Sequence, residues 1–454
     1  GIAGAQGCCT RAPPMWLCMQ ASQLSYGGSD SFGQGGGSLF MDWPHRMDLQ
    51  LNTYYTLICA ALVLLLGKWL VANIRWLRNF NIPEPVAGGL VAAVLCYVLY
   101  AVWGYRLGFD ADLQTAFMLV FFSSIGLSAN FTKLKEGGRA LLLFLLVIAV
   151  YIGVQNGVGV SLATLLGLDP LGGLIAGSMT LLGGHGTAGA WGSVLERDYG
   201  VQGAMTLGMA CATFGLVIGG LVGGPLAKWL IRRHQLQGPH VAAAGTDTDN
   251  LVEADAYNFE SPRKTRLITT DATIETLALF AGCLAFAQLM TTATAGASFQ
   301  LPTFVWALAG GVVIRNALDY VFRFKVFDRA IDVFGNAALS IYLAIALLSL
   351  KLWELADLAG PLVIILAVQT VVMAAYVGLV TFRVMGRDYD AAVLCAGNCG
   401  FGMGATPTAV ANMQAITNQY GPSHKAFLIV PMVGAFFIDL LNAVFLQTFI
   451  KLLG

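Results

Sequence analysis

Ten stretches of apolar residues, each long enough to cross a lipid bilayer, recur along this chain. A membrane-spanning helix needs roughly 20 such residues, because the hydrocarbon core is about 30 Å thick. Of the 454 residues, 57% are hydrophobic and 11% are charged. These values predict an all-α polytopic membrane protein. The stretches cover about 51–70, 86–104, 115–131, 140–166, 203–231, 267–292, 301–318, 330–350, 359–382 and 425–449.

Charge and motifs narrow the class of function. The 25 basic and 25 acidic residues balance, so no net charge indicates nucleic acid or another charged macromolecule as a partner. The sequence contains no H-E-x-x-H, G-x-S-x-G or G-x-x-x-x-G-K-[ST] motif, and we therefore predict no enzyme, organic cofactor or transition-metal site. Cys395 and Cys399, one helical turn apart, are interpreted as small packing residues.

Basic residues indicate how the spans are oriented. With the N-terminus outside, most Lys and Arg residues, among them Lys68, Arg232 and Arg329, fall in cytoplasmic loops, as the positive-inside rule requires. The C-terminus is then also outside. This pattern holds only if 170–197 and 389–414, which are glycine-rich and semi-polar, each enter and leave on one side. We therefore predict two re-entrant hairpins.

The same order of elements occurs twice. Residues 47–233 and 267–454 each contain five spans with a glycine-rich hairpin between the fourth and fifth, and the polar segment 234–266 reads as a cytoplasmic linker. Because five is odd, the second repeat is inverted relative to the first, an arrangement typical of secondary transporters. Residues 1–46, rich in Gly and Ser, are expected to be an added leader or a disordered extension.

Two glycine-rich segments predict the binding site. In hydrocarbon, a backbone N–H or C=O group without a hydrogen-bond partner costs several kcal/mol. Irregular backbone at membrane depth is therefore found only where it is buried inside the protein or lines a water-filled cavity. "GGHGTAG" (183–189) and "GNCGFGMGATPT" (397–408) add Thr, Asn and Pro to their glycines, and we predict that both line a site. In "GLVIGGLVGGP" (215–225) the spacing of Gly215, Gly219 and Gly223 instead predicts close helix packing.

Several long blocks resemble the bacterial sodium/glutamate symporter family. They include "IPEPVAGGL" (82–90), "GGHGTAGAW" (183–191), "ACATFGLVIGGLVGGP" (210–225) and "GFGMGATPTAVANMQAIT" (400–417). The resemblance covers about 47–450. It implies an inner-membrane symporter that takes up L-glutamate with Na+, built from two inverted five-span repeats. It further implies a homodimer in which a transport unit moves against a scaffold.

For such a substrate the two hairpin tips are the predicted contacts. The spans hold few basic residues, so the glutamate carboxylates are expected to meet backbone N–H groups and hydroxyls. The expected contacts are Gly184, His185, Gly186, Thr187, Gly404, Ala405, Thr406 and Thr408. His185 is interpreted as a hydrogen-bond donor or gate in preference to a proton carrier.

Intramembrane acids are costly and are therefore functional candidates. Asp439 lies well inside the last stretch and is predicted to bind the substrate ammonium or Na+. Glu275 is either a dimer-face or an interfacial acid, and Glu84 is expected to shape the start of the second span. Arg315 is interpreted as an ordinary cytoplasmic-edge charge.

Sodium prefers oxygen ligands. The predicted donors are Ser123, Ser124, Asn130, Asn398, Gly402, Asn412 and Asn442. The alternatives left open are another carboxylate such as citrate as substrate, and coupling to protons. The sequence does not fix the number of sodium ions for each glutamate.

Overall fold

The computed structural model describes residues 47–79, 82–129, 131–238, 268–295, 301–324, 326–350 and 359–453. Within this part of the chain, nine helices are long and apolar enough to span a membrane. They coincide with the first nine predicted stretches, which identifies a multi-pass membrane protein. The predicted extension lies outside the described residues, as do residues 239–266 of the predicted linker.

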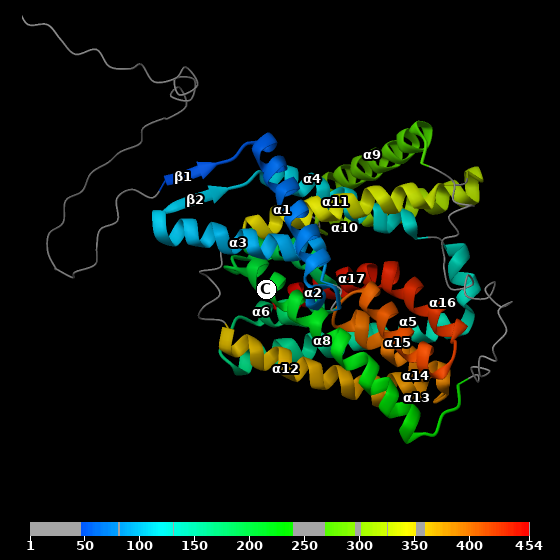
Figure 1. Cartoon of the computed structure of the whole chain (residues 1–454). Coiled ribbons are helices and arrows are strands. Elements are labelled where there is room, and N and C mark those ends of the chain that lie inside the picture. Colours follow the sequence, from blue (N-terminus) through cyan, green and yellow to red (C-terminus); the bar gives the residue numbers. More distant parts are fainter. Residues whose placement is uncertain are drawn as a thin grey trace, which may run out of the picture. The chain divides into compact units, whose positions relative to one another are not determined.

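Helices from both halves of the sequence form a first packed group, which we call the outer group (Figure 1). Its members contact one another far more than they contact the remaining helices. They are α1 (Thr53–Asn73), α3 (Glu84–Trp103), α4 (Ala111–Ser128), α9 (Thr270–Ala293), α10 (Thr303–Ala317) and α11 (Asp328–Leu348). The short elements β1 (Met47–Gln50), α2 (Arg75–Asn79), β2 (Tyr105–Gly108) and η3 (Leu318–Phe322) connect to them. The two strands, which the sequence did not predict, pair in parallel.

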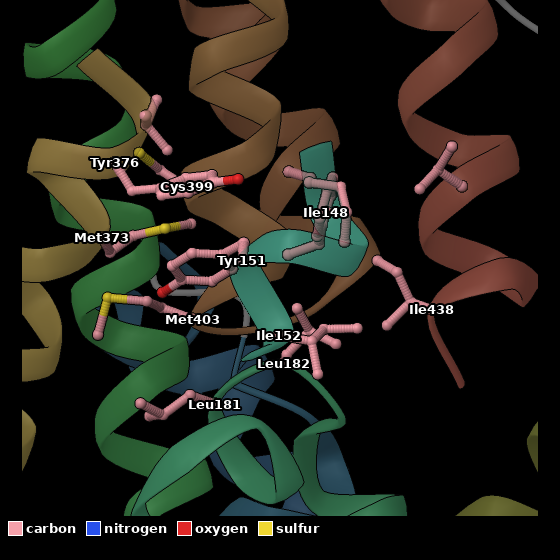
Figure 2. Packing of buried hydrophobic residues seen from close by; sticks show 14 of the residues in the cluster. Ile148, Tyr151, Ile152, Leu181, Leu182, Met373, Tyr376, Cys399, Met403 and Ile438 are labelled. Carbon is pink, nitrogen blue, oxygen red and sulfur yellow. The ribbon is translucent and has the colours of Figure 1, made fainter. Parts of the chain in front are cut away.

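The remaining helices form a second group, the core group, drawn in the lower part of Figure 1. From the first half they are α5 (Phe131–Leu165), α6 (Pro170–Leu174), η1 (Ile175–Met179), α7 (Gly184–Tyr199) and α8 (Ala204–Arg233). From the second half they are α12 (Ala359–Tyr376), η5 (Val377–Thr381), α13 (Phe382–Val384), α14 (Tyr389–Gly402), α15 (Thr406–Tyr420), α16 (His424–Met432), η6 (Val433–Phe437) and α17 (Ile438–Leu453). Figure 2 shows how Ile148, Ile152, Leu182 and Ile438 join these elements in one buried cluster.

The tenth predicted stretch, 425–449, is not one regular helix. Pro431 lies inside α16, and the π-helical turn η6 separates α16 from α17. Proline cannot donate the backbone hydrogen bond of a helix interior and crowds the preceding turn. Gly434, in η6, lies against Thr406, whose Oγ1 would lie 2.8 Å from a Cβ at residue 434.

Two helical segments are interrupted at their glycine-rich centres. The first runs through α6 and η1, breaks before Gly184 and continues as α7; the second breaks between α14 and α15. Both begin with the same local chemistry, because the Asp169 and Asp388 carboxylates cap their helices, at 2.8 Å to Leu171 N and 2.7 Å to Ala391 N. Such caps satisfy N–H groups that have no partner within the helix.

The glycines of α8 serve close packing, as predicted. A Cβ at Gly215 would lie 2.2 Å from the Met403 carbonyl oxygen, and one at Gly219 would lie 3.2 Å from the Cys399 carbonyl oxygen. Any larger residue would push α14 away from α8. The second interrupted segment is therefore held against α8 by direct backbone contact.

Candidate functional site

A cavity of about 500 Å³ lies where the outer group meets the core group. Both helix breaks open onto it. The lining residues are Leu182–Gly186, Gly404–Pro407, Gly434, Ile438 and Asp439 from the core group, and Pro83, Pro85, Phe121, Ser124, Ile125, Ser128, Asp332, Asn336, Leu339, Ser340 and Leu343 from the outer group.

The first break presents the N-terminus of α7 to the cavity. Gly184 begins the helix with φ +66°, a left-handed conformation that glycine adopts without steric cost. A Cβ at Gly184 would lie 3.4 Å from the Gly404 carbonyl oxygen, so the two breaks are in contact.

The second break presents the N-terminus of α15. Ala405 is extended (φ −156°, ψ 161°), and Thr406 and Pro407 start the helix. The first N–H groups of a helix have no partner within it and carry the positive end of the helix dipole. Two such ends therefore face one cavity from different halves of the chain.

Acidic side chains supply the opposite charge. Asp439 lines the cavity, and the Thr187 hydroxyl is a hydrogen-bond partner of its carboxylate. Across the cavity, Ser128 Oγ donates to Asp332 Oδ1 at 3.3 Å. The described lining residues include neither Lys nor Arg. An anionic group bound here must therefore meet N–H and hydroxyl groups, while a cation can meet carboxylates.

His185 is held in one orientation. Its Nε2 lies 3.0 Å from Thr213 Oγ1, and that hydroxyl donates to the Met209 carbonyl at 2.8 Å. Since a hydroxyl carries one proton, Thr213 must accept from His185, which fixes the proton of a neutral imidazole on Nε2. The Nε2–H is thus engaged by α8. In the neutral imidazole Nδ1 is then an acceptor, so donation to a ligand from Nδ1 would require the doubly protonated ring.

The predicted substrate contacts fall into two sets. Gly184, His185, Gly186, Gly404, Ala405, Thr406 and Asp439 all line the cavity, and Thr187 lies beside Asp439. Thr408 does not line it: the residue is 1% exposed, and its Cγ2 lies 3.5 Å from the position of a Cβ on Gly220 of α8. Eight of the nine predicted residues are thereby brought to one place.

The predicted sodium donors are scattered. Ser123 and Ser124 donate to carbonyls of their own helix, at 2.8 Å and 2.7 Å, as buried serines commonly do. Asn412 donates to the Gly219 carbonyl at 2.9 Å and so joins α15 to α8. Of these residues, Ser124 alone is a lining residue of the cavity, and Asn130 lies outside the described residues.

The other three sodium candidates belong to buried polar contacts of the core group. Asn442 accepts from Ser178 Oγ at 2.6 Å and donates to the Ser178 carbonyl at 3.0 Å. Asn398 donates to Thr381 Oγ1 at 2.9 Å, and the Gly402 carbonyl accepts from Gln155 Nε2 at 3.2 Å. The sequence analysis did not identify Gln155, because a single Gln in a long apolar span is not a distinctive pattern.

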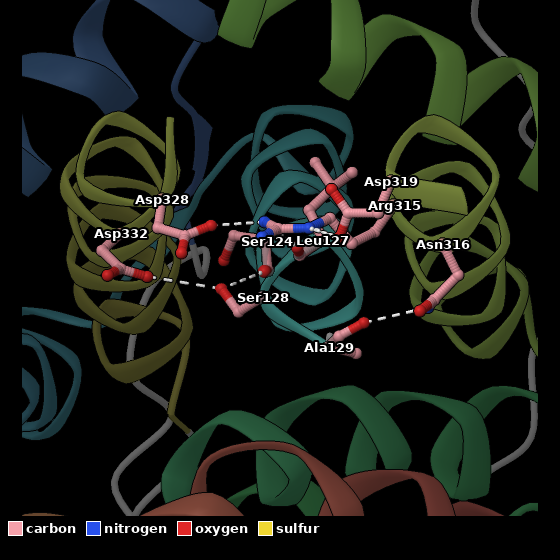
Figure 3. Close-up of polar contacts among 9 residues, drawn as sticks. All are labelled: Ser124, Leu127, Ser128, Ala129, Arg315, Asn316, Asp319, Asp328 and Asp332. Carbon is pink, nitrogen blue, oxygen red and sulfur yellow. Dashed lines mark hydrogen bonds and ion pairs between the residues drawn. The ribbon is translucent and has the colours of Figure 1, made fainter. Parts of the chain in front are cut away.

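Arg315 is not the ordinary charge that was predicted, because it is buried and paired. Its side chain is 5% exposed; it pairs with Asp319 at 2.8 Å and with Asp328, and it donates to the Leu127 carbonyl at 3.1 Å (Figure 3). The guanidinium thus ties α4, α10 and α11 together.

Asp332, which the sequence analysis did not identify, lies one turn after Asp328 and lines the cavity. The acids Glu84 and Glu275 are exposed on α3 and α9.

Comparison with known proteins decides the family. The family model for the sodium/glutamate symporter matches residues 49–422. The chain belongs to the sodium/glutamate symporter family. It is 52% identical over 401 residues to the sodium/glutamate symporter of Haemophilus influenzae, and 50% identical over 402 residues to those of Escherichia coli and Shigella flexneri. Each alignment covers 88% of this chain and 98% of the relative. The family match includes both helix breaks.

Proposed function

We propose that this protein is a secondary transporter that takes up L-glutamate together with Na+ by alternating access. The observation that carries the proposal is the cavity between the two helix groups, which combines two helix N-termini with two acidic side chains. Membership of the sodium/glutamate symporter family supports the same substrate and coupling ion. No catalytic step is part of this function.

The charges of glutamate suit the cavity. One carboxylate is assigned to the N-terminus of α7 (Gly184, His185, Gly186), and the other to the start of α15 with the Thr406 hydroxyl. Helix N-termini bind anions through free N–H groups and the helix dipole. The ammonium group is assigned to Asp439, since a carboxylate forms charge-assisted hydrogen bonds to ammonium.

Coupling to Na+ follows from the net charge of the substrate. Glutamate carries one negative charge, and moving one charge against the membrane potential costs roughly 2.3 kcal/mol per 100 mV. One bound Na+ cancels this cost, and a second would add driving force. The ions are therefore expected to bind to the same group of helices that carries the substrate.

The arrangement of the helices supports an elevator mechanism built on inverted repeats. Each half of the chain contributes its first three spans to the outer group, and its fourth span, interrupted segment and last span to the core group. The interrupted segments also start alike, since Gly167 and Gly386 both have positive φ and Asp169 and Asp388 both cap. We propose that both segments are re-entrant hairpins and that the core group moves against the outer group.

The proposed location is the bacterial inner membrane, with both termini outside and the linker 234–266 in the cytoplasm. Basic residues of the predicted cytoplasmic loops support this orientation. A homodimer remains a prediction. Its interface is expected on the outer group, where α1 and α9 leave most of their apolar surface uncovered.

Transport by purified protein in proteoliposomes tests the proposal. Radiolabelled glutamate should accumulate when an inward Na+ gradient is imposed, and much less with an equal K+ gradient. Uptake that does not depend on Na+ but follows a proton gradient would overturn the coupling ion. Uptake of citrate in preference to glutamate would overturn the substrate.

A further inference from the structure

Three buried carboxamides lie close together within the core group. Gln155 on α5, Gln369 on α12 and Asn398 on α14 are all 0% exposed. Their nitrogens are engaged: Gln155 Nε2 donates to the Gly402 carbonyl at 3.2 Å, Gln369 Nε2 to the Gln155 carbonyl at 2.8 Å, and Asn398 Nδ2 to Thr381 Oγ1 at 2.9 Å. The two Gln bonds link α5, in the first half of the chain, to α14 and α12 in the second half.

The oxygens of the same three groups are unsatisfied. Gln155 Oε1, Gln369 Oε1 and Asn398 Oδ1 find no hydrogen-bond partner among the described residues. The Tyr151 hydroxyl, one turn before Gln155 on α5, is also buried and unpartnered within the same part of the chain. Leaving a buried acceptor unpaired costs about 1–3 kcal/mol, so several in one region require an explanation.

Several of these contacts meet at Gly402, the last residue of α14. A Cβ at Gly402 would lie 3.5 Å from Asn398 Oδ1 and 2.2 Å from Met373 Cε, and Met373 is one turn after Gln369 on α12. Figure 2 shows the Tyr151 ring among Met373, Tyr376, Cys399 and Met403. The Asn398 oxygen and the Gln155 carboxamide therefore lie at the C-terminal end of α14, where the dipole is negative, and Gln369 bonds to the backbone of Gln155.

We infer that this cluster, formed by Tyr151, Gln155, Gln369, Asn398 and the Gly402 carbonyl, binds one Na+. The inference rests on the proposed function. Neutral oxygen donors match a small, hard monovalent cation, and the Gly402 carbonyl keeps a second lone pair after accepting from Gln155. With Na+ bound, the buried carbonyl oxygens gain the partner that they lack.

The position of the cluster explains how ion and substrate are coupled. Gly402 lies two residues before Gly404, which lines the cavity and contacts Gly184. An ion that fixes the end of α14 orders the tip on which the glutamate carboxylate is proposed to rest. The loss of conformational entropy at this tip then accompanies Na+ binding rather than glutamate binding. The affinity for glutamate is therefore higher when Na+ is bound.

Sodium-dependent stabilisation of the full chain tests the inference without substrate. Purified protein is unfolded by heat in increasing NaCl, with KCl keeping the ionic strength constant. A ligand that binds only the folded state raises its stability with concentration. The sodium concentration that gives half of the shift should rise at least about tenfold in Gln155→Met and in Gln369→Met, because each loses one ligand while keeping its volume.

Thr370→Val is the matched control, because Thr370 follows Gln369 and its hydroxyl donates to its own helix, at 2.8 Å to the Leu366 carbonyl. It should keep the wild-type sodium dependence. Either Gln variant alone is sufficient if the other does not fold. In uptake assays, the Gln variants should need more Na+ for half-maximal rate, with the glutamate KM at saturating Na+ changed less than about twofold.

The outcomes separate this inference from the proposed function. If wild-type uptake requires Na+ and both variants keep the wild-type sodium dependence, the cluster holds water or nothing and the inference is wrong. If wild-type uptake is independent of Na+, the proposed function itself fails. A shift that NaCl and KCl produce equally would also overturn a sodium site.

Discussion

Polar groups lie in two apolar regions of the molecule, and the two regions differ in whether these groups have partners. In the outer group, the Arg315 guanidinium is surrounded by Asp319, Asp328 and the Leu127 carbonyl (Figure 3). In the core group and along the cavity, carboxamide oxygens lack partners within the described chain, and two helix N-termini face an open space. The first arrangement is complete and holds three helices together. The second is incomplete, as a site for ligands must be.

This contrast separates structure from transport. A buried charge that is fully paired contributes mainly through the cost of disturbing it. Polar groups that face a cavity stabilise little until a ligand reaches them, so their loss should alter transport more than folding. The following variants test whether the two regions differ in this way.

The largest effect is expected for Asp439→Asn. The substitution keeps the size of the side chain but removes the charge that we assign to the substrate ammonium. Losing one charged partner of a buried pair costs about 2–5 kcal/mol, so glutamate uptake at low substrate should fall at least about 30-fold. The thermal midpoint should stay near wild type. Asp271→Asn, at the exposed start of α9, is the control, and normal uptake by Asp439→Asn would remove Asp439 from the site.

Arg315→Met should produce the reverse pattern. It leaves Asp319 and Asp328 without their cation. Breaking a buried pair costs about 3–5 kcal/mol, and the 41% exposure of the Asp328 side chain reduces this to about 2 kcal/mol. A lower thermal midpoint is expected, with uptake per folded molecule within about twofold of wild type. Arg197→Met, which breaks a pair with side chains 73% and 45% exposed, should change stability little. Lost uptake in a stably folded Arg315→Met would contradict the contrast.

A smaller effect is expected for Thr406→Val. This variant removes one hydroxyl at the start of α15 and preserves the shape of the side chain. A neutral hydrogen bond contributes about 0.5–1.5 kcal/mol, so the glutamate KM should rise about three- to tenfold. Thr417→Val, in the same helix with an exposed hydroxyl that donates to the Gln414 carbonyl, is the control. An unchanged KM would mean that the carboxylate rests on backbone N–H groups alone.

The sequence by itself determined the membrane class, nine of the spans, both helix breaks and most of the core-group residues that line the cavity. These depend on local signals: hydropathy over about 20 residues, and glycine and proline where a helix cannot continue. The packing role of Gly215 and Gly219 was predictable for the same reason, because small residues at this spacing have one common use in membranes.

Only the tertiary structure decided which polar residues are partnered. Arg315 read as an edge charge because the Asp328 carboxylate and the Leu127 carbonyl, which complete its surroundings, come from other helices. Gln155 and Gln369 are 214 residues apart, and each is inconspicuous in its own apolar span. Whether a buried polar group is satisfied is a property of the atoms that folding brings beside it, and no local pattern in the sequence encodes it.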